Sequence, residues 1–373
     1  MKKIITVLLI IFLTGCYNYR ELNKIGIVSA ISIDKEDNKY IVGAQVMNIK
    51  NEDTDSSKVI VYTEEGNTIE EALRNMTNKA DKKLFGGHLS KLVISEEVAK
   101  DSIIDVIDLF QRLPEIKTEF NITISKNIKA VDVIKVMTSG GTIPADFVKN
   151  EIDSAYLDSA LTYSSKLDEF VSFYLKKYID PVVSVIEVEN YDEKGTSLDN
   201  TMKTNPDTKI VLSNIGITSN GKLERYLNEE ETIGYNLVRN NINELIVPIK
   251  CDENNYASIS IIKSETKYDV NKNKIEIDIN SNGNLNEYNC NKDINEDTIK
   301  ELESKAESEL KEYINKVLKV QNSSSSEFLG LKRLIYLEYP DYNNEEYKLY
   351  INTNVNISRK GELDNSIKGE KNE

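Results

Sequence analysis

Histidine and tryptophan are the scarcest residues of this 373-residue chain, which has one histidine, His88, no tryptophan and three cysteines. Catalysis by a Ser–His–Asp or Cys–His arrangement would therefore rest on His88 alone. The G-x-S-x-G, H-E-x-x-H and phosphate-binding glycine motifs are also missing. We therefore predict a chain that is not an enzyme and has no cofactor or metal site. The Gly86-Gly87-His88 stretch is interpreted as a tight bend before a strand, with His88 bonded to the backbone.

Positive charge is also in short supply. Forty-seven Lys and Arg residues stand against 62 Asp and Glu residues, which gives a formal net charge of −15. Removal of Lys2 and Lys3 with a leader would take it to −17, since −15 minus 2 is −17. Such a surface argues against a nucleic-acid partner and against broad electrostatic docking to anionic lipid.

Long hydrophobic runs are missing apart from residues 4–13, IITVLLIIFL, which follow two lysines. This run is shorter than the ~20 apolar residues that span a membrane, and it has the form of a signal peptide. Leu13-Thr14-Gly15-Cys16 resembles the bacterial lipobox. That resemblance implies lipid attachment to the Cys16 sulfur and cleavage before it, so residues 1–15 are a lipoprotein signal peptide. A plain secreted protein with an incidental cysteine is the alternative.

The other two cysteines, Cys251 and Cys290, lie in stretches predicted as neighbouring strands or their ends. An exported chain could join them in a disulfide, although sequence alone does not establish the geometry that a disulfide needs.

Hydrophobic periodicity predicts an α+β fold of several domains, with mixed sheets and packed helices. Strands are expected at 25–33, 40–48, 58–62, 91–95, 119–125, 182–188, 209–218, 245–249, 256–263, 274–280 and 346–358. Helices are expected at 69–80, 96–112, 228–239 and 294–321, and one or two helices at 156–178. The last helix is expected against an antiparallel sheet. Residues 191–207 are almost without apolar side chains and are predicted to be a linker. It would separate an N-terminal α/β region, 16–190, from a strand-rich α+β domain, 208–360, and residues 361–373 would form a disordered tail.

The chain also resembles a known family from its first mature residues onward. Cys16-Tyr17-Asn18-Tyr19-Arg20-Glu21-Leu22 is similar to the Cys-Trp-[Asp/Asn]-x-Arg-Glu-Leu start of the C subunits of spore germinant receptors, the Ger(x)C lipoproteins, with Tyr17 in place of the usual Trp. Matching stretches follow in order at 25–34, 87–99, 212–227, 231–234, 298–321, 328–330 and 359–361.

The resemblance implies a non-catalytic, lipid-anchored subunit on the outer face of the spore inner membrane, held in the bilayer by the Cys16 acyl chains. It also implies assembly with an A subunit and a multispanning B subunit into a receptor for nutrient germinants. Arg20, Glu21 and Leu22 follow the lipid and are the candidates for docking to these partners, although they could simply begin a helix. A substrate-binding lipoprotein of an importer and a lipid-anchored cell-wall enzyme are the alternatives.

Overall fold

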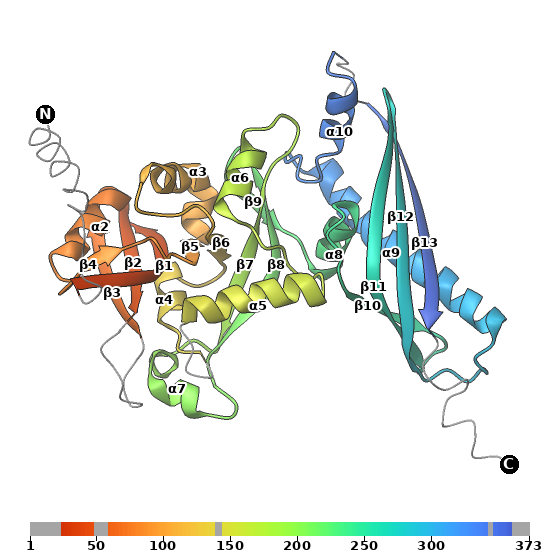
Figure 1. The fold of residues 1–373 in the computed structure, drawn as a ribbon, viewed down its shortest axis with the longest axis horizontal. Helices are drawn as coiled ribbons and strands as arrows, with labels where there is room; N and C mark the ends of the chain where they lie inside the picture. The colour runs from red at the N-terminus through yellow and green to blue at the C-terminus, as the bar shows by residue number, and fades with distance from the viewer. Residues whose placement is uncertain (1–23, 48–58, 139–143, 342–345, 360–373) are drawn as a thin grey trace, which may run out of the picture.

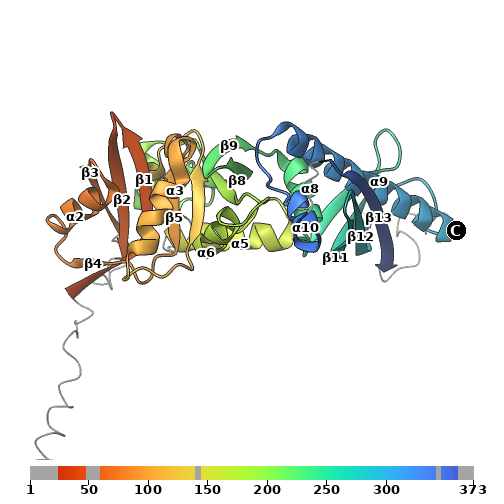
Figure 2. The ribbon, with the colours of Figure 1, turned by 90° about the horizontal axis from the view of Figure 1, so that it is seen from above.

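The computed structural model describes residues 24–47, 59–138, 144–341 and 346–359. Two sheets lie side by side along the long axis of the molecule, and helix α8 (Glu229–Val238) lies between them (Figures 1 and 2). The predicted mixed α+β class is confirmed. The predicted tail, 361–373, lies outside the described residues.

The first sheet has parallel strands at its centre and antiparallel strands on both sides. In the described chain its order is β3-β2-β1-β5-β6-β7-β8-β9, with β4 also pairing with β1. Its strands are β1 (Ile25–Glu36), β2 (Lys39–Met47), β3 (Val59–Gly66), β4 (Lys83–Phe85), β5 (Lys91–Ser95), β6 (Asn121–Ser125), β7 (Val182–Glu189), β8 (Lys209–Ser219) and β9 (Lys222–Tyr226). The predicted hairpin of β1 and β2 is confirmed, because Asp37 and Asn38 both take positive φ in the two-residue turn.

Helices cover both faces of this sheet. They are α2 (Ile69–Thr77), α3 (Glu96–Arg112) and α6 (Leu167–Tyr174) on one face, and α4 (Ala130–Lys135) and α5 (Pro144–Asp158) on the other (Figure 1). Strands β5 and β6 are therefore buried along their whole length. The prediction of one or two helices at 156–178 is wrong in its bounds, since α5 begins earlier, at Pro144, and α6 is the second helix; the structure also adds the short helix α4.

The second sheet has the order β10-β11-β12-β13 and packs against α9 (Glu296–Ser323). Its strands are β10 (Leu245–Lys250), β11 (Tyr256–Asn271), β12 (Lys274–Tyr288) and β13 (Lys348–Arg359), and α10 (Leu331–Glu338) follows α9 in the chain. The expectation of a purely antiparallel sheet is wrong, because β13 runs parallel to β12. The long α9 connection carries the chain back to the end from which β12 starts, which a parallel pair requires.

Helix α8 connects the two sheets. Its capping box is complete: the Asn228 side chain accepts the Glu231 N–H, and the Glu231 carboxylate accepts the Asn228 N–H. A Cβ on Gly234 would lie 2.3 Å from the carbonyl oxygen of Tyr313 on α9, so only glycine permits this approach. On the other side, the Asn236 amide donates to the carbonyl oxygens at 160 and 162, at 2.8 and 3.1 Å. One short helix thus fixes the second sheet to the first.

The predicted linker at 191–207 differs from the structure. Strands β7 and β8, which it joins, are antiparallel neighbours in the first sheet, and β9 extends the same sheet. Residues 208–226 therefore belong with the N-terminal unit rather than with a separate C-terminal domain. The segment itself contains a 3₁₀ turn, η3 (Glu193–Thr196), and a short helix, α7 (Leu198–Met202).

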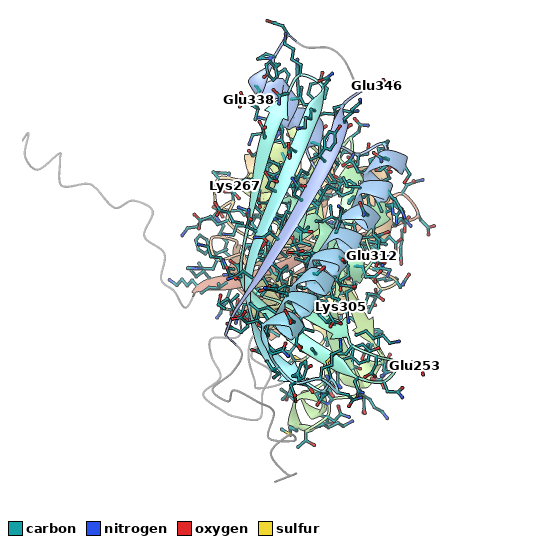
Figure 3. The ribbon with its side chains drawn as sticks, turned by 90° about the vertical axis from the view of Figure 1, so that its right-hand side faces the viewer. Glu253, Lys267, Lys305, Glu312, Glu338 and Glu346 are labelled. Atoms are coloured by element: carbon teal, nitrogen blue, oxygen red, sulfur yellow. A yellow bond between two sulfur atoms is a disulfide. The ribbon has the colours of Figure 1, made fainter. Side chains whose placement is uncertain are left out.

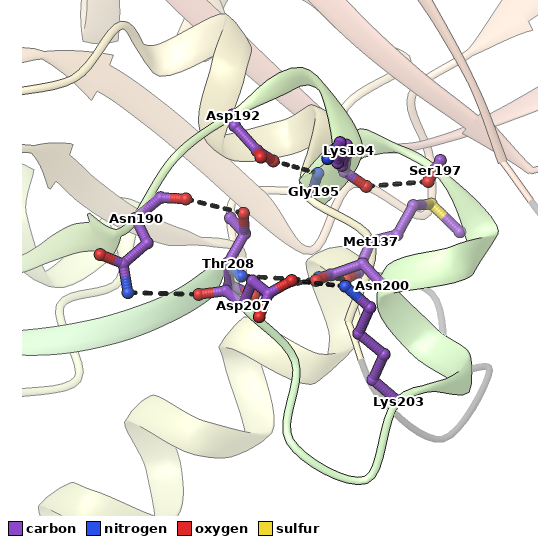
Figure 4. Close-up of polar contacts among 10 residues, drawn as sticks. All are labelled: Met137, Asn190, Asp192, Lys194, Gly195, Ser197, Asn200, Lys203, Asp207 and Thr208. Carbon is purple, nitrogen blue, oxygen red and sulfur yellow. Dashed lines mark hydrogen bonds and ion pairs between the residues drawn. The ribbon is translucent and has the colours of Figure 1, made fainter.

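Polar contacts, not apolar ones, order this segment (Figure 4). Asn200 is buried, and its amide nitrogen donates to the carbonyl oxygens of Met137 and Thr208 at 2.9 and 3.0 Å. The Thr208 hydroxyl donates to the carbonyl oxygen of Asn190 at 2.9 Å. A Cβ on Gly195 would lie 2.4 Å from the Thr208 hydroxyl oxygen. The low apolar content of residues 191–207 therefore predicted a linker, whereas the structure has an ordered segment held by hydrogen bonds.

Candidate functional site

The residues predicted to carry the lipid and to dock partners, Cys16, Arg20, Glu21 and Leu22, lie outside the described residues. The described chain begins at Lys24, directly before β1. Strand β1 lies in the interior of the first sheet, between β2 and β5, so whatever holds the N-terminus is attached to the core of this unit. No helix in the described part of the chain is long and apolar enough to cross a membrane.

The structure joins Cys251 and Cys290 in a disulfide, with their Cα atoms 5.8 Å apart. Cys251 follows β10 and Cys290 follows β12, and these strands lie on either side of β11. Asp252 orders the turn between β10 and β11 by accepting the N–H groups of Asn254 and Asn255 at 3.2 and 3.1 Å. The bond therefore crosses the end of the second sheet.

Oxidation of this pair should stabilise the second unit. The cysteines are 39 residues apart, and closing a loop of that length stabilises by about 4 kcal/mol on the chain-entropy argument. We expect the double variant Cys251→Ser/Cys290→Ser to lose about 2–4 kcal/mol of unfolding free energy, measured by urea denaturation. Reductant should reproduce the loss in the parent chain and have no effect on the variant. Alkylation of both thiols in unreduced, denatured protein would show that the pair does not form.

Lys91, which the sequence analysis missed, is the largest charged side chain buried in the first unit. It lies in β5 with 1% of its surface exposed, and its ammonium nitrogen is 3.4 Å from the Thr123 hydroxyl oxygen. Burial lowers the pKa of Lys91 to about 7, and nearby Asp153 opposes that shift. The Thr123 hydroxyl in turn lies 3.0 Å from that of Ser184 on β7. A lysine placed directly before three apolar residues of a short strand, in KLVIS, was the signal available in the sequence.

A second buried charge holds helix α4. Asp34 on β1 accepts the N–H groups of Ala130 and Val131 at 2.7 and 2.8 Å, which are the first two residues of that helix. Its carboxylate thus satisfies donors that the helix itself cannot. Burial is the largest influence on its pKa and raises it to about 6, despite the two hydrogen bonds. The Asp34 carboxylate is thus occupied by the first N–H groups of α4, and the Lys91 ammonium group lies against the Thr123 hydroxyl.

His88 is exposed in the turn between β4 and β5. The bend is confirmed by a hydrogen bond from the Leu89 N–H to the Gly86 carbonyl oxygen at 3.0 Å. The imidazole ring, expected to bond the backbone, instead contacts the edge of the Phe85 ring, with centroids 6.2 Å apart. Within the described ranges, no group of three His, Cys, Asp or Glu residues could hold a metal ion.

The described surface has two sizeable open hollows. One, of about 970 Å³, lies between α9, α10 and the first half of β13. The other, of about 750 Å³, lies beside α5 and α6 and is lined by Lys149, Asp153, Tyr163 and Glu169 among others. In the second hollow two carboxylates accept hydrogen bonds from hydroxyls: the Tyr163 hydroxyl donates to Glu169, and Ser164 donates to Asp153 at 2.8 Å. Both hollows are open clefts in the surface rather than enclosed cavities.

This arrangement defines a two-unit α+β protein with an attached N-terminal extension and a buried polar core that serves the fold. The chain belongs to the Ger(x)C family of spore germination proteins. Residues 18–188 match the family described as spore germination protein N-terminal domain, and residues 213–366 match the one described as spore germination B3/GerAC like, C-terminal.

Two further comparisons agree with this assignment. The chain is 27% identical over 258 residues to spore germination protein KC of Bacillus subtilis (strain 168), and the match covers 66% of this chain. It spans 63% of that relative's length, which is less than two thirds. The crystal structure of the GerBC protein superposes with a TM-score of 0.54 at 17% identity, covering 87% of this chain and 96% of that one. The likeness to GerBC shows a shared fold.

Proposed function

We propose that this spore germination protein is the lipid-anchored, non-catalytic subunit of a nutrient germinant receptor, located on the outer face of the spore inner membrane. The observation that carries the proposal is the order of the N-terminal features. A lipobox ends at Cys16, and the family match begins two residues later at position 18. Lipid attached to Cys16 would then hold the protein directly beside the start of the family match, and two or more acyl chains would anchor it stably.

The short distance from the lipid to the fold limits where partners can contact it. Eight residues separate Cys16 from β1, and they span at most about 28 Å when fully extended. The first unit would therefore stay close to the bilayer, and Arg20, Glu21 and Leu22 would lie at the membrane face. We propose that these three residues contact the membrane-embedded A and B subunits of the receptor.

The importer alternative is less well supported by the architecture. Substrate-binding proteins of that kind need two similar α/β lobes around a cleft. Here a nine-stranded mixed sheet with helices on both faces accompanies a four-stranded sheet with one long helix. The two units therefore differ in size, topology and covering.

Deletion of the gene in its spore-forming host tests the proposal. Spores should fail to respond to particular amino acids or sugars while still germinating with exogenous dipicolinate, because only the nutrient receptor is missing. A copy of the gene returned at another locus should restore the response. Normal germination on every nutrient, together with a defect in solute uptake or wall turnover, would refute the receptor role and favour the importer or the enzyme.

A further inference from the structure

Strand β13 forms one edge of the second sheet, and half of that edge is already capped. In the order β10-β11-β12-β13 it pairs with β12 alone. The N–H groups of Val355 and Ile357 point away from β12 and donate to carboxylates of α9, those of Glu307 at 3.1 Å and Glu303 at 2.9 Å. Two glutamates thus occupy the positions where another strand would bond.

The other half of the edge is open. Alternate residues of a strand direct their N–H and C=O groups to the same side, and the β12–β13 register is regular from Lys348 to Ile357. The groups of Leu349, Ile351 and Thr353 therefore face the same way as those of Val355. Among the described residues no hydrogen bond to the N–H of Ile351 or Thr353 is found. These three residues form a row of backbone groups ready to pair with another strand.

The open half of the edge is also one wall of the larger hollow, whose volume is about 970 Å³. Leu349 and Ile351 line it from β13, Leu318 from α9 and Leu331 from α10. Figure 3 looks onto this side of the second unit, where α9, marked by Lys305 and Glu312, runs beside β13, which begins next to Glu346. A groove between a strand edge and a helix offers an extended peptide both backbone hydrogen bonds and apolar contacts for alternate side chains.

The charges at the groove favour an acidic occupant. Lys319, Lys332 and Lys348 line it, whereas the chain as a whole carries a net charge of −15. Glu327 pairs with Lys332 at 2.6 Å, and Glu346 is the other carboxylate in the lining. This is a locally positive site on an acidic protein, so it attracts carboxylates more than its surroundings do.

We infer that this groove binds an extended segment of a partner protein by β-strand addition along Leu349 to Thr353. The segment has apolar side chains at alternate positions and at least one carboxylate facing Lys319 or Lys348. A second copy of this chain is disfavoured as the occupant by the net charge of −15 on each copy. The chain's own residues 360–373 are also a disfavoured occupant. They follow the C-terminal end of β13, and to pair with the strand from there they would first meet the part of the edge that Glu303 and Glu307 cap.

The test uses the full chain in the membranes of its host spores, and its readout does not depend on germination. A photo-crosslinking amino acid replaces Lys319 on the groove wall, and in a control it replaces Asn354, which is exposed on the opposite face of β13. We expect an adduct with a partner chain from position 319 only, mapped by mass spectrometry to an extended apolar and acidic segment.

Two matched variants then ask whether the strand edge is responsible. Thr353→Pro removes one outward N–H and no bond to β12, as edge strands tolerate, whereas Thr353→Val retains that N–H. Both lose the same hydroxyl contact to the Glu307 carbonyl oxygen. The adduct yield should be about fivefold lower in the proline variant than in the valine variant, the scale of one lost hydrogen bond. If the proline variant does not accumulate, Lys348→Glu, which leaves the backbone intact, should lower the yield instead.

Three results would overturn the inference. They are equal yields from Thr353→Pro and Thr353→Val, an adduct with a second copy or with residues 360–373, and the lack of any adduct from position 319. Normal nutrient germination after deletion of the gene, together with a mapped adduct from position 319, would count against the proposed receptor role and leave the inferred groove contact standing. Loss of nutrient germination in Cys16 variants, together with the lack of an adduct from position 319 in the parent chain, would support the receptor role and overturn the inference about the groove.

Discussion

Replacing Cys16 by alanine is expected to abolish membrane anchoring of the mature chain and most of the nutrient response of the spores. In the proposed modification the Cys16 sulfur is the nucleophile that takes the lipid, and alanine has none. Each buried CH₂ of an acyl chain contributes about 0.8 kcal/mol to membrane binding, so loss of all chains removes the anchor altogether. We expect the amount of acylated, membrane-retained protein to fall at least about tenfold. The affinity that even one acyl chain provides for a membrane accounts for roughly that change.

The measurement combines intact-mass analysis of the N-terminus with germination on nutrients and on exogenous dipicolinate. The variant should retain residues 1–15, carry no acyl mass and respond normally to dipicolinate. Tyr17→Phe, one residue beyond the lipobox, is the matched control and should be processed and anchored as the parent chain is. A fully active Cys16→Ala spore would show that assembly does not need the lipid.

Lys91→Met is expected to stabilise the first unit, and by an amount that falls as the pH rises. Burial holds the pKa of Lys91 at about 7, against 10.5 for an ordinary lysine. Between these values the unfolded chain binds a proton that the folded chain does not, so the stability of the parent rises with pH. The slope approaches about 1.4 kcal/mol per pH unit. Methionine fills a similar volume without this cost.

Urea denaturation at pH 7, 8 and 9 measures the effect. The variant should exceed the parent by about 4 kcal/mol at pH 7 and by about 2 kcal/mol at pH 9. This range lies above the pKa of Asp34, about 6, and below the region where the buried tyrosines, whose pKa values are raised, would begin to ionise in the unfolded chain. Lys117→Met, at an exposed site, should change little. A difference that stays constant with pH would mean that Lys91 is charged in the folded protein.

The strongly periodic segments were predictable from sequence, and the polar ones were not. Helix α3 begins and ends at the predicted residues 96 and 112, because a capped amphipathic stripe specifies its own limits, although the backbone kinks at Ser102 within it. The segment at 191–207 was misassigned because Asn200 and Thr208 order it through hydrogen bonds that leave no hydrophobic pattern. The parallel pairing of β13 depends on contacts between distant parts of the chain, which local periodicity does not encode.

The functional residues divide in the same way. Cys16 could be proposed because a processing enzyme recognises a short linear signal, and that proposal remains a prediction. The cysteines at 251 and 290 were visible as candidates, but only the fold brings them to the same end of a sheet. Lys91 and the open edge of β13 were not predicted, since burial of a charge and the absence of a neighbouring strand are properties of the assembled structure.

The passage of β7 into β8 across residues 190–208 has a consequence for how this protein can be divided. The two family matches meet between residues 188 and 213, at the very place where these strands are hydrogen-bonded to each other. A cut there would separate the β8–β9 pair from β7, the strand through which it joins the first sheet, and would leave β7 with a bare edge, which invites aggregation. The boundary between the two family matches therefore lies inside the first sheet, and halves expressed separately should be rescued by co-expression rather than by solubility tags.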